Sequence, residues 1–195
     1  KYDYQNRALM NWPKNLVFDL TQKQELDKLM TNDVVNQLVP PIYFKASSMT
    51  IEKTYKNIIA IFDVDPQRKS DHFGISSYND YDLDSYQAHK NFLTDIINAG
   101  KNIDCTFMIK PKRKLSKKRE LIEYIELLDK LNKLSNVIVL SPEIPTFHLI
   151  NKAKLVISFP FTSTSIIAKL MSKTSVFYDS TNELNLSDPA ARGIE

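Results

Sequence analysis

The amino-acid sequence predicts an α/β protein with a Rossmann-like parallel sheet and helices on both faces of that sheet. From residue 57 onward, short apolar runs alternate with segments of helical character. The apolar runs do not alternate polar and apolar positions, which is typical of strands that are covered on both faces. Strands and helices in strict alternation form a doubly wound parallel sheet, because the crossovers between parallel strands are right-handed.

The predicted elements follow one another in the order β-α-β-α-β-α-β-α-β. The first helix has one apolar face and is followed by Gly100, which is suited to ending a helix. The second helix carries a leucine and isoleucine stripe and follows Ser116, which is suited to capping it. The predicted strands are residues 58–62, 105–109, 137–140, 155–159 and 175–178, and the predicted helices are residues 85–99, 117–134, 144–153 and 164–173.

The N-terminal part of the chain does not follow this rhythm. We expect residues 1–50 to be a connector or the tail of a preceding domain, and residues 51–195 to be the Rossmann-like domain. The chain ends on "SDPAARGIE" without a terminal helix, so we expect it to be a piece of a longer protein. The elements predicted in the N-terminal part are a strand over 16–20, a helix over 21–30 capped by Thr21, and a short strand over 39–44.

Composition limits the classes of function. The chain has 195 residues, of which 43% are hydrophobic and 25% are charged, which suits a globular domain with a real core. The single cysteine, Cys105, excludes a disulfide within the chain and fits a reducing compartment. No apolar run approaches the roughly 18–20 residues that cross a bilayer, and the first residues lack a signal-peptide core, so a cytoplasmic location is predicted. The three histidines show no metal-ligand spacing, so neither a metal nor a cofactor is expected.

The positive charge is concentrated in one segment. Residues 110–120 hold seven basic residues and one acidic residue, a charge of +6, which leaves −3 for the rest of a chain whose net charge is +3. This asymmetry favours a local anionic partner over a broad nucleic-acid surface. The segment also lacks the aromatic residues on which bases stack, so no nucleic acid is expected. Residues 110–119 are instead expected to make peripheral contact with an anionic membrane, or to form a solvated basic loop.

Four hydroxyl residues stand where the fourth strand meets the last helix, in the stretch "SFPFTSTSIIAK". Ligands of doubly wound sheets bind outside the carboxyl ends of the strands. Helix N-termini bind anions, and hydroxyl groups supply further donors to phosphate oxygens. With only three glycines the chain has no glycine-rich phosphate loop, so this stretch is predicted to bind phosphate in its place. The hydroxyl residues are Thr162, Ser163, Thr164 and Ser165.

Charged residues follow the other predicted strands at the same edge of the sheet. Lys110 and Arg113 follow the second strand and are predicted to neutralise a phosphate. Glu143 follows the third strand and is predicted to accept hydrogen bonds from a nucleotide base or ribose. Asp63 and Asp65 follow the first strand and are further candidates.

The aspartates also support an alternative function. The stretch "IIAIFDVDPQ" resembles the DxDx[TV] motif of haloacid-dehalogenase phosphatases, which implies Asp63 as the nucleophile and Asp65 as the acid or base. Gln67 stands where that motif has threonine or valine, and the acidic pair that the family carries near its end is absent. A second alternative is a non-catalytic nucleotide-binding or interaction module.

The sequence resembles the bacterial polysaccharide biosynthesis family that is named for its PFTS motif. The motif stands at Pro160-Phe161-Thr162-Ser163 and continues as "TSIIAKLMSKTSVFYD". Over residues 57–192 the chain also looks like the C-terminal, nucleotide-binding half of a GT-B glycosyltransferase. This resemblance implies a nucleotide-sugar donor, linked to CMP or UDP, and a glycan or lipid-linked acceptor in capsule or lipopolysaccharide biosynthesis. It also implies that the general base comes from the other half.

A looser similarity extends to bacterial sialyltransferases and capsule transferases that use CMP-sugars. Their serine and threonine motif corresponds to Ser163–Thr164, and their His-Pro motif corresponds to Lys110–Pro111. Lysine stands here in place of histidine, and its ordinary pKa of ~10.4 makes it a poorer proton donor at neutral pH.

Overall fold

The computed structural model describes residues 12–17, 19–30, 33–39, 51, 54–66, 85–115, 121–182, 185, 191 and 193–194. The chain divides into two compact units, Lys1–Phe44 and Lys45–Glu195. Each unit is described by itself. Among the described residues, no helix is both long enough and apolar enough to cross a membrane.

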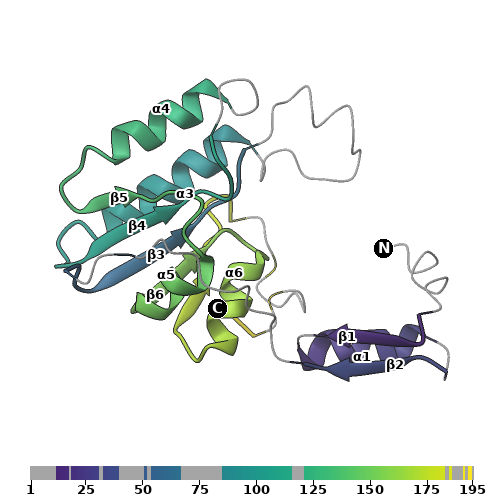
Figure 1. Ribbon diagram of the computed structural model, residues 1–195. Coiled ribbons are helices and arrows are strands. Elements are labelled where there is room, and N and C mark those ends of the chain that lie inside the picture. Colours follow the sequence, from purple (N-terminus) through teal and green to yellow (C-terminus); the bar gives the residue numbers. More distant parts are fainter. Residues whose placement is uncertain are drawn as a thin grey trace. The chain divides into compact units, whose positions relative to one another are not determined.

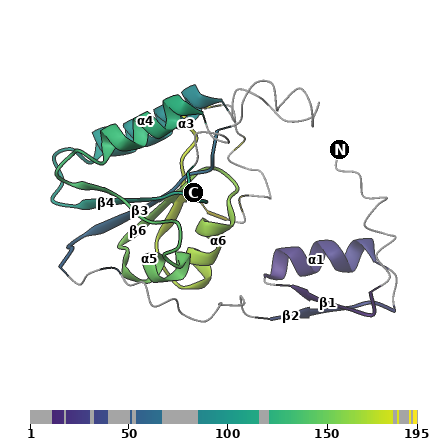
Figure 2. The same ribbon diagram turned by 45° about the horizontal axis from the view of Figure 1, so that its top comes forward.

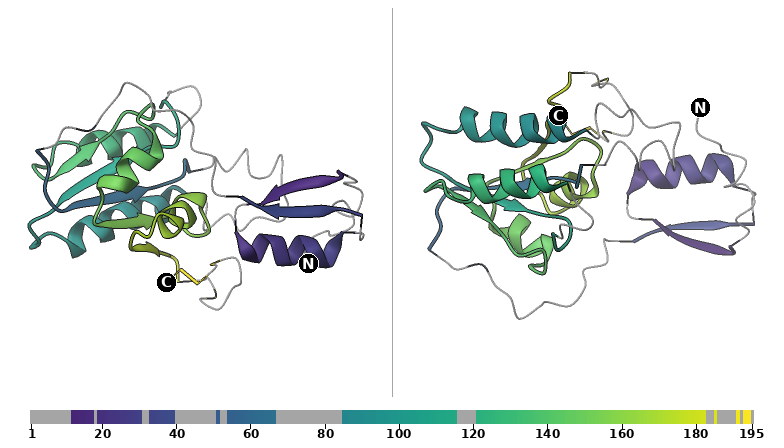
Figure 3. Two further views of the ribbon diagram at one scale, coloured as in Figure 1. Left: turned by 60° about the horizontal axis from the view of Figure 1, so that its bottom comes forward. Right: turned by 90° about the horizontal axis from the view of Figure 1, so that it is seen from above.

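The first unit is a β-α-β element. Strands β1 (Lys14–Val17) and β2 (Val35–Leu38) pair in parallel, and helix α1 (Leu20–Leu29) packs along one face of the pair (Figure 3). The polar side chains of Asn15, Asn36 and Asp27 are hydrogen-bonded to one another between the strands and the helix.

Three expectations for this unit differ from the structure. The first strand ends earlier than predicted, at Val17. The helix is capped by Asp19 instead of Thr21, because the extended backbone of Asp19 lets its carboxylate accept a hydrogen bond from the Gln22 amide at 2.8 Å. The strand β2 was not predicted. Of the strand predicted over 39–44, all but Val39 lies outside the described residues.

The second unit contains a five-stranded, all-parallel sheet in the order β5-β4-β3-β6-β7 (Figure 1). The Rossmann-like fold predicted from the sequence is therefore confirmed. Because strand order reverses between β3 and β6, the switch point of the sheet lies between these two strands. The strands are β3 (Ile58–Phe62), β4 (Thr106–Lys110), β5 (Val137–Val139), β6 (Leu155–Ser158) and β7 (Ser175–Phe177).

Helices cover both faces of this sheet. Helices α3 (Tyr86–Ala99) and α4 (Ile122–Leu131) lie on one face, and helices α5 (Thr146–Lys152) and α6 (Ser163–Leu170) lie on the other (Figure 2). Each face has its own buried core. The core under α3 and α4 contains Phe92 and Tyr124, whereas the core over α5 and α6 contains Met108 and Leu149.

Helix α3 begins and ends where the sequence predicts. The Ser85 side chain accepts a hydrogen bond from the Ala88 amide at its start, and Gly100 is its C-cap. Glycine is required at position 100 by close packing, because a Cβ there would lie 2.3 Å from the ring of Phe107. For helix α4, the predicted cap Ser116 and first residues 117–120 lie outside the described part of the chain.

Candidate functional site

The carboxyl ends of the central strands bring the predicted site residues to one edge of the sheet. Phe62 at the end of β3 pairs in register with Lys110 of β4 and with Ser158 of β6. Neighbouring strands lie roughly 4.8 Å apart, which puts Lys110 and Ser158 roughly 10 Å apart on either side of Phe62. The loops that follow these strands carry the aspartates, the basic residues and the hydroxyl cluster.

Strand β6 leads into helix α6 through a tight turn over residues 159–162, which we call the 159–162 turn. The Thr162 amide donates to the Phe159 carbonyl at 3.3 Å, and Pro160 occupies the second position. Phe161 has a φ of +58°, a left-handed conformation that costs free energy in a bulky residue. A proline followed by a left-handed residue is the pattern of a type II turn, in which glycine usually takes the third position. The turn therefore holds a strained residue inside the PFTS motif.

The hydroxyl groups around this turn bond mostly to one another. Thr162 Oγ1 donates to the Phe159 carbonyl at 2.8 Å, Thr164 Oγ1 lies 3.1 Å from Thr162 Oγ1, and Ser158 Oγ lies 2.8 Å from Thr164 Oγ1. Each hydroxyl carries one hydrogen, so Thr164 donates to Thr162 and Ser158 donates to Thr164. All three hydrogens are thus committed within the chain of hydroxyls. The predicted role of Thr162 and Thr164 as side-chain donors to phosphate does not fit this geometry.

The two remaining hydroxyl residues differ sharply from each other. Ser165 is fully buried and donates to the Val176 carbonyl of β7 at 3.2 Å, so its hydroxyl is directed into the sheet and away from the predicted ligand. Ser163 is exposed, and the described part of the chain shows no hydrogen bond to its hydroxyl. The first amides of an α-helix have no partner within the helix, and no described side chain caps those of α6. The donors left at this helix start are these amides and the Ser163 hydroxyl.

Lys110 is a buried cation on the same face of the sheet as α6. Its side chain is only 7% exposed, and its ammonium donates to the Pro142 carbonyl at 3.1 Å. No carboxylate among the described residues forms an ion pair with this ammonium. Burial lowers the pKa of Lys110 below its usual value, because removal from water disfavours the charged form. An anionic ligand beside Lys110 would compensate its charge.

Two other predicted residues lie at the rim of this edge. Arg113 Nε lies 3.7 Å from Asp65 Oδ2, so an ion pair joins the loops that follow β4 and β3. Glu143 is exposed after β5, and its amide donates to the Ser141 hydroxyl at 3.3 Å. The basic residues Lys117, Lys118 and Arg119, and with them part of the predicted membrane contact, lie outside the described residues.

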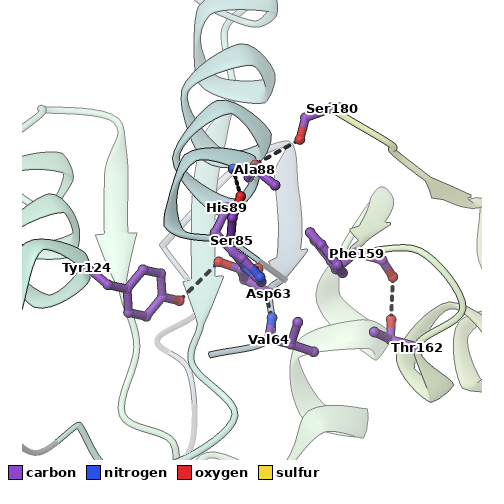
Figure 4. A network of polar contacts seen from close by, with 9 residues as sticks. All are labelled: Asp63, Val64, Ser85, Ala88, His89, Tyr124, Phe159, Thr162 and Ser180. Atoms are coloured by element: carbon purple, nitrogen blue, oxygen red, sulfur yellow. Dashed lines mark hydrogen bonds and ion pairs between the residues drawn. The ribbon is translucent and has the colours of Figure 1, made fainter. Parts of the chain in front are cut away.

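Asp63 lies at the centre of a buried polar network (Figure 4). Its Oδ1 accepts a hydrogen bond from the Val64 amide at 2.8 Å and lies 2.7 Å from His89 Nδ1. Its Oδ2 accepts a hydrogen bond from the Tyr124 hydroxyl at 3.0 Å. The side chains of Asp63 and His89 are both completely buried. A nucleophilic carboxylate has to reach its substrate, so this burial does not favour the haloacid-dehalogenase interpretation, with Asp63 as nucleophile.

The sequence did not point to His89 as part of this network. Its place in the α3 pattern, three residues before Phe92 and four before Leu93, is the one signal that puts it on the buried face. The ring of His89 stacks on that of Phe159, with centroids 4.4 Å apart and planes 5° from parallel. His89 Nε2 is buried and has no hydrogen-bond partner among the described residues. The network thus joins β3, α3 and α4 to the start of the 159–162 turn.

The described residues contain no group of three or more side chains suited to holding a metal ion.

Comparisons with known proteins place this sequence in a family. No curated protein matches the sequence. A solved structure of Thermosulfurimonas dismutans KpsC, a beta Kdo 2,4 transferase, is similar with a TM-score of 0.39 and 11% sequence identity. The match covers 67% of this chain and 37% of that chain, so this chain spans well under two thirds of the length of KpsC. The family model described as "Polysaccharide biosynthesis PFTS motif protein" matches residues 1–195, and the chain therefore belongs to this polysaccharide biosynthesis family.

Proposed function

We propose that this chain is the donor-binding half of a GT-B glycosyltransferase that uses a nucleotide-activated sugar, linked to CMP or UDP, in bacterial surface polysaccharide biosynthesis. One observation carries the proposal. The uncapped start of α6 and the buried ammonium of Lys110 lie on the same face of the sheet, on either side of the β3 end at the switch point. Membership of a polysaccharide biosynthesis family supports the reaction class.

Lys110 supplies the charge in this proposal. A buried ammonium is costly when, as among the described residues here, it has no carboxylate partner, and an anionic ligand offsets that cost. The pKa of Lys110 is lowered because burial disfavours the charged form. A phosphate or diphosphate between Lys110 and α6 gives the cation a partner in this proposal.

The start of α6 supplies the directional donors. The amides of Ser163, Thr164 and Ser165 stand at the positive end of the helix dipole, where an anion is stabilised. The exposed Ser163 hydroxyl adds one side-chain donor. The hydroxyls of Thr162 and Thr164 act indirectly, because they hold the turn that presents these amides.

The proposed chemistry is stabilisation of a leaving phosphate. When the bond between the sugar and the phosphate breaks, negative charge develops on the phosphate, and donors already in place favour that state. Glu143 is exposed beside the site and accepts hydrogen bonds from the base or ribose in this proposal. The general base for the acceptor hydroxyl comes from another domain. We therefore propose that residues 1–195 bind the donor, and that transfer to a glycan or lipid-linked acceptor requires the second half.

The basic segment 110–119 is proposed to contact an anionic membrane at its periphery, with the exposed Lys112 and Lys114 as its described part.

Calorimetric titration of CMP-, UDP- and GDP-sugars into the 195-residue chain tests the proposal. We expect saturable binding of one nucleotide class, and about a tenfold loss of affinity in Lys110→Gln, which corresponds to about 1.4 kcal/mol. Lys112→Gln is the matched control, because it removes the same charge from an exposed position two residues away. Equal losses of affinity in both variants would show that Lys110 contributes only through the net charge of the chain. Absence of binding for every nucleotide sugar by the folded wild-type chain would refute the donor site. Binding without transfer, once the second half is supplied, would favour a non-catalytic nucleotide-binding module.

A further inference from the structure

We propose that His89 is a positioning residue for the phosphate site, which it controls through the ring of Phe159 without touching the ligand. The inference rests on the proposed function, since it concerns the same site. It assigns a role to a buried Asp63–His89 pair that the proposed chemistry does not itself use. Contacts lead from this pair to the ring of Phe159, and from Phe159 to the 159–162 turn.

The first step is that the imidazole of His89 has a fixed plane. Asp63 Oδ1 lies 2.7 Å from His89 Nδ1, and the carboxylate is itself held by the Val64 amide and the Tyr124 hydroxyl. An ionised carboxylate only accepts hydrogen bonds, so the hydrogen between the two groups is on Nδ1. Rotation of the ring would leave a buried carboxylate oxygen without one of its donors, which is costly.

The second step is that this imidazole fixes the ring of Phe159. The two rings are 5° from parallel with centroids 4.4 Å apart, and Phe92 meets Phe159 edge-on at 5.4 Å. Phe159 is therefore held on its face by His89 and at an angle of 70° by Phe92. Its side chain is almost completely buried, so it has little freedom to move without disturbing the core.

The third step is that Phe159 holds the 159–162 turn. Its amide donates to the Phe62 carbonyl at 2.9 Å, which fastens the turn to the end of β3. Its carbonyl accepts two hydrogen bonds from Thr162, one from the amide and one from the hydroxyl. Thr162 is the N-cap residue of α6, so the position of Phe159 determines where the helix amides point.

The chemistry of the pair favours a positioning role over simple core packing. An aliphatic side chain at position 89 would fill the space without a desolvation cost, whereas a buried polar pair pays that cost and leaves His89 Nε2 without a described partner. What the polar pair adds is a defined orientation, because the Asp63 carboxylate is held by the Val64 amide and the Tyr124 hydroxyl and in turn holds His89 Nδ1. The strained Phe161 in the same turn needs such support, because its left-handed conformation is unfavourable by itself.

The first test uses the ligand-free chain, so that it does not depend on the proposed function. Nuclear magnetic resonance of the imidazole nitrogens should show the hydrogen on Nδ1 of His89. In His89→Asn, which keeps a donor toward Asp63 but loses the ring, exchange of the Thr162 amide, which donates to the Phe159 carbonyl, should rise about tenfold more than overall destabilisation explains. Val137→Ala is the matched control, since it also removes buried atoms but in β5, away from the turn. A hydrogen on Nε2, or equal exchange in the variant and the control, would overturn the proposal.

The second test asks whether His89 acts through Phe159. The probes are inorganic phosphate and CMP, titrated into the wild-type chain, His89→Asn, Phe159→Leu and the double variant. We expect each single variant to weaken binding about tenfold and the double variant to weaken it little further, because both changes release the same turn. Fully additive losses would overturn the proposed route through Phe159.

The two tests distinguish failure of the proposed function from failure of the positioning role of His89. If the wild-type chain binds neither these probes nor any of the nucleotide sugars, the proposed function fails, while the exchange data from the ligand-free chain still decide the positioning role. If His89→Asn does not fold, the nitrogen signals of the wild-type chain and the amide exchange of Phe159→Leu decide it.

Discussion

His89 and Phe159 stack face to face, with ring centroids 4.4 Å apart and ring planes 5° from parallel. This contact spans the switch point, since His89 lies on the helix that follows β3 and Phe159 follows β6. Doubly wound sheets bind their ligands where the strand order reverses. The two halves of the sheet are thus joined by a buried aromatic contact directly beside the edge at which the donor phosphate is proposed to bind.

The buried hydroxyl of Ser165 and the exposed hydroxyl of Ser163 give the first prediction. Ser165→Ala should lower the free energy of unfolding by about 1 kcal/mol, because it removes a buried hydrogen bond to the Val176 carbonyl, and it should leave nucleotide affinity nearly unchanged. Ser163→Ala should do the reverse, since Ser163 is exposed and available to a ligand. Urea unfolding and calorimetric titration of both variants measure the two effects. Loss of affinity in Ser165→Ala with none in Ser163→Ala would contradict the assignment.

Gly100 gives a prediction about the core. Gly100→Ala should destabilise the chain by about 1–3 kcal/mol, because the added Cβ would lie 2.3 Å from the ring of Phe107 and the core resists overpacking. The backbone of Gly100 has a φ of −93°, which any residue adopts, so the cost comes from the collision alone. Thermal unfolding followed by circular dichroism measures it, with the exposed Asn98→Ala in the same helix end as control. A Gly100→Ala variant as stable as the wild type would show that the Phe107 ring moves aside easily.

Much of this fold was predictable from the sequence. The five strands of the large sheet were predicted to within one residue at each end, because strands buried on both faces have continuous apolar sequences. Helix α3 was predicted to within one residue at each end, because its apolar face is followed directly by Gly100. Strand β2 was missed because its sequence, "VNQL", has no apolar run and three of its four residues are exposed.

The site was predictable only in outline. The order of strands places Lys110 and the hydroxyl cluster at one edge, and this follows from the alternation of elements. The hydrogen-bond partners of the individual hydroxyls do not follow from the alternation of elements. Ser165 bonds to an acceptor on β7, and Thr164 bonds to a residue on β6. The Asp63–His89 pair joins residues 26 positions apart, a contact that no local pattern encodes.

The strained residue of the PFTS motif gives a third prediction. Phe161→Ala and Phe161→Gly both lose the contact with the Phe177 ring, but only glycine relieves the left-handed backbone at φ +58°. The glycine variant should therefore be more stable than the alanine variant by up to about 1 kcal/mol. At Phe177, in strand β7, the order should reverse, because glycine weakens a strand and gains nothing there. Denaturant unfolding of the four variants decides it, and an alanine variant at 161 as stable as the glycine variant would contradict the strain.

The buried ammonium of Lys110 gives the last prediction, which concerns pH. Burial lowers the pKa of Lys110 in the folded chain below the ordinary value of 10.5, so between these two values the unfolded chain binds more protons than the folded chain. The free energy of unfolding should therefore rise with pH as the solution passes through the lowered pKa, and this gain should be complete near 10.5. Lys110→Met should lose this part of the pH dependence, and it should be as stable as the wild type or more stable near neutral pH.

The nucleotide affinity of the wild-type chain should fall as pH rises through the lowered pKa, because deprotonation of Lys110 removes the charge that binds the phosphate. Chemical denaturation and calorimetry at several pH values follow both quantities. Lys112→Met, at an exposed position, is the control. If the free energy of unfolding depends on pH in the same way in both variants, burial does not lower the pKa of Lys110.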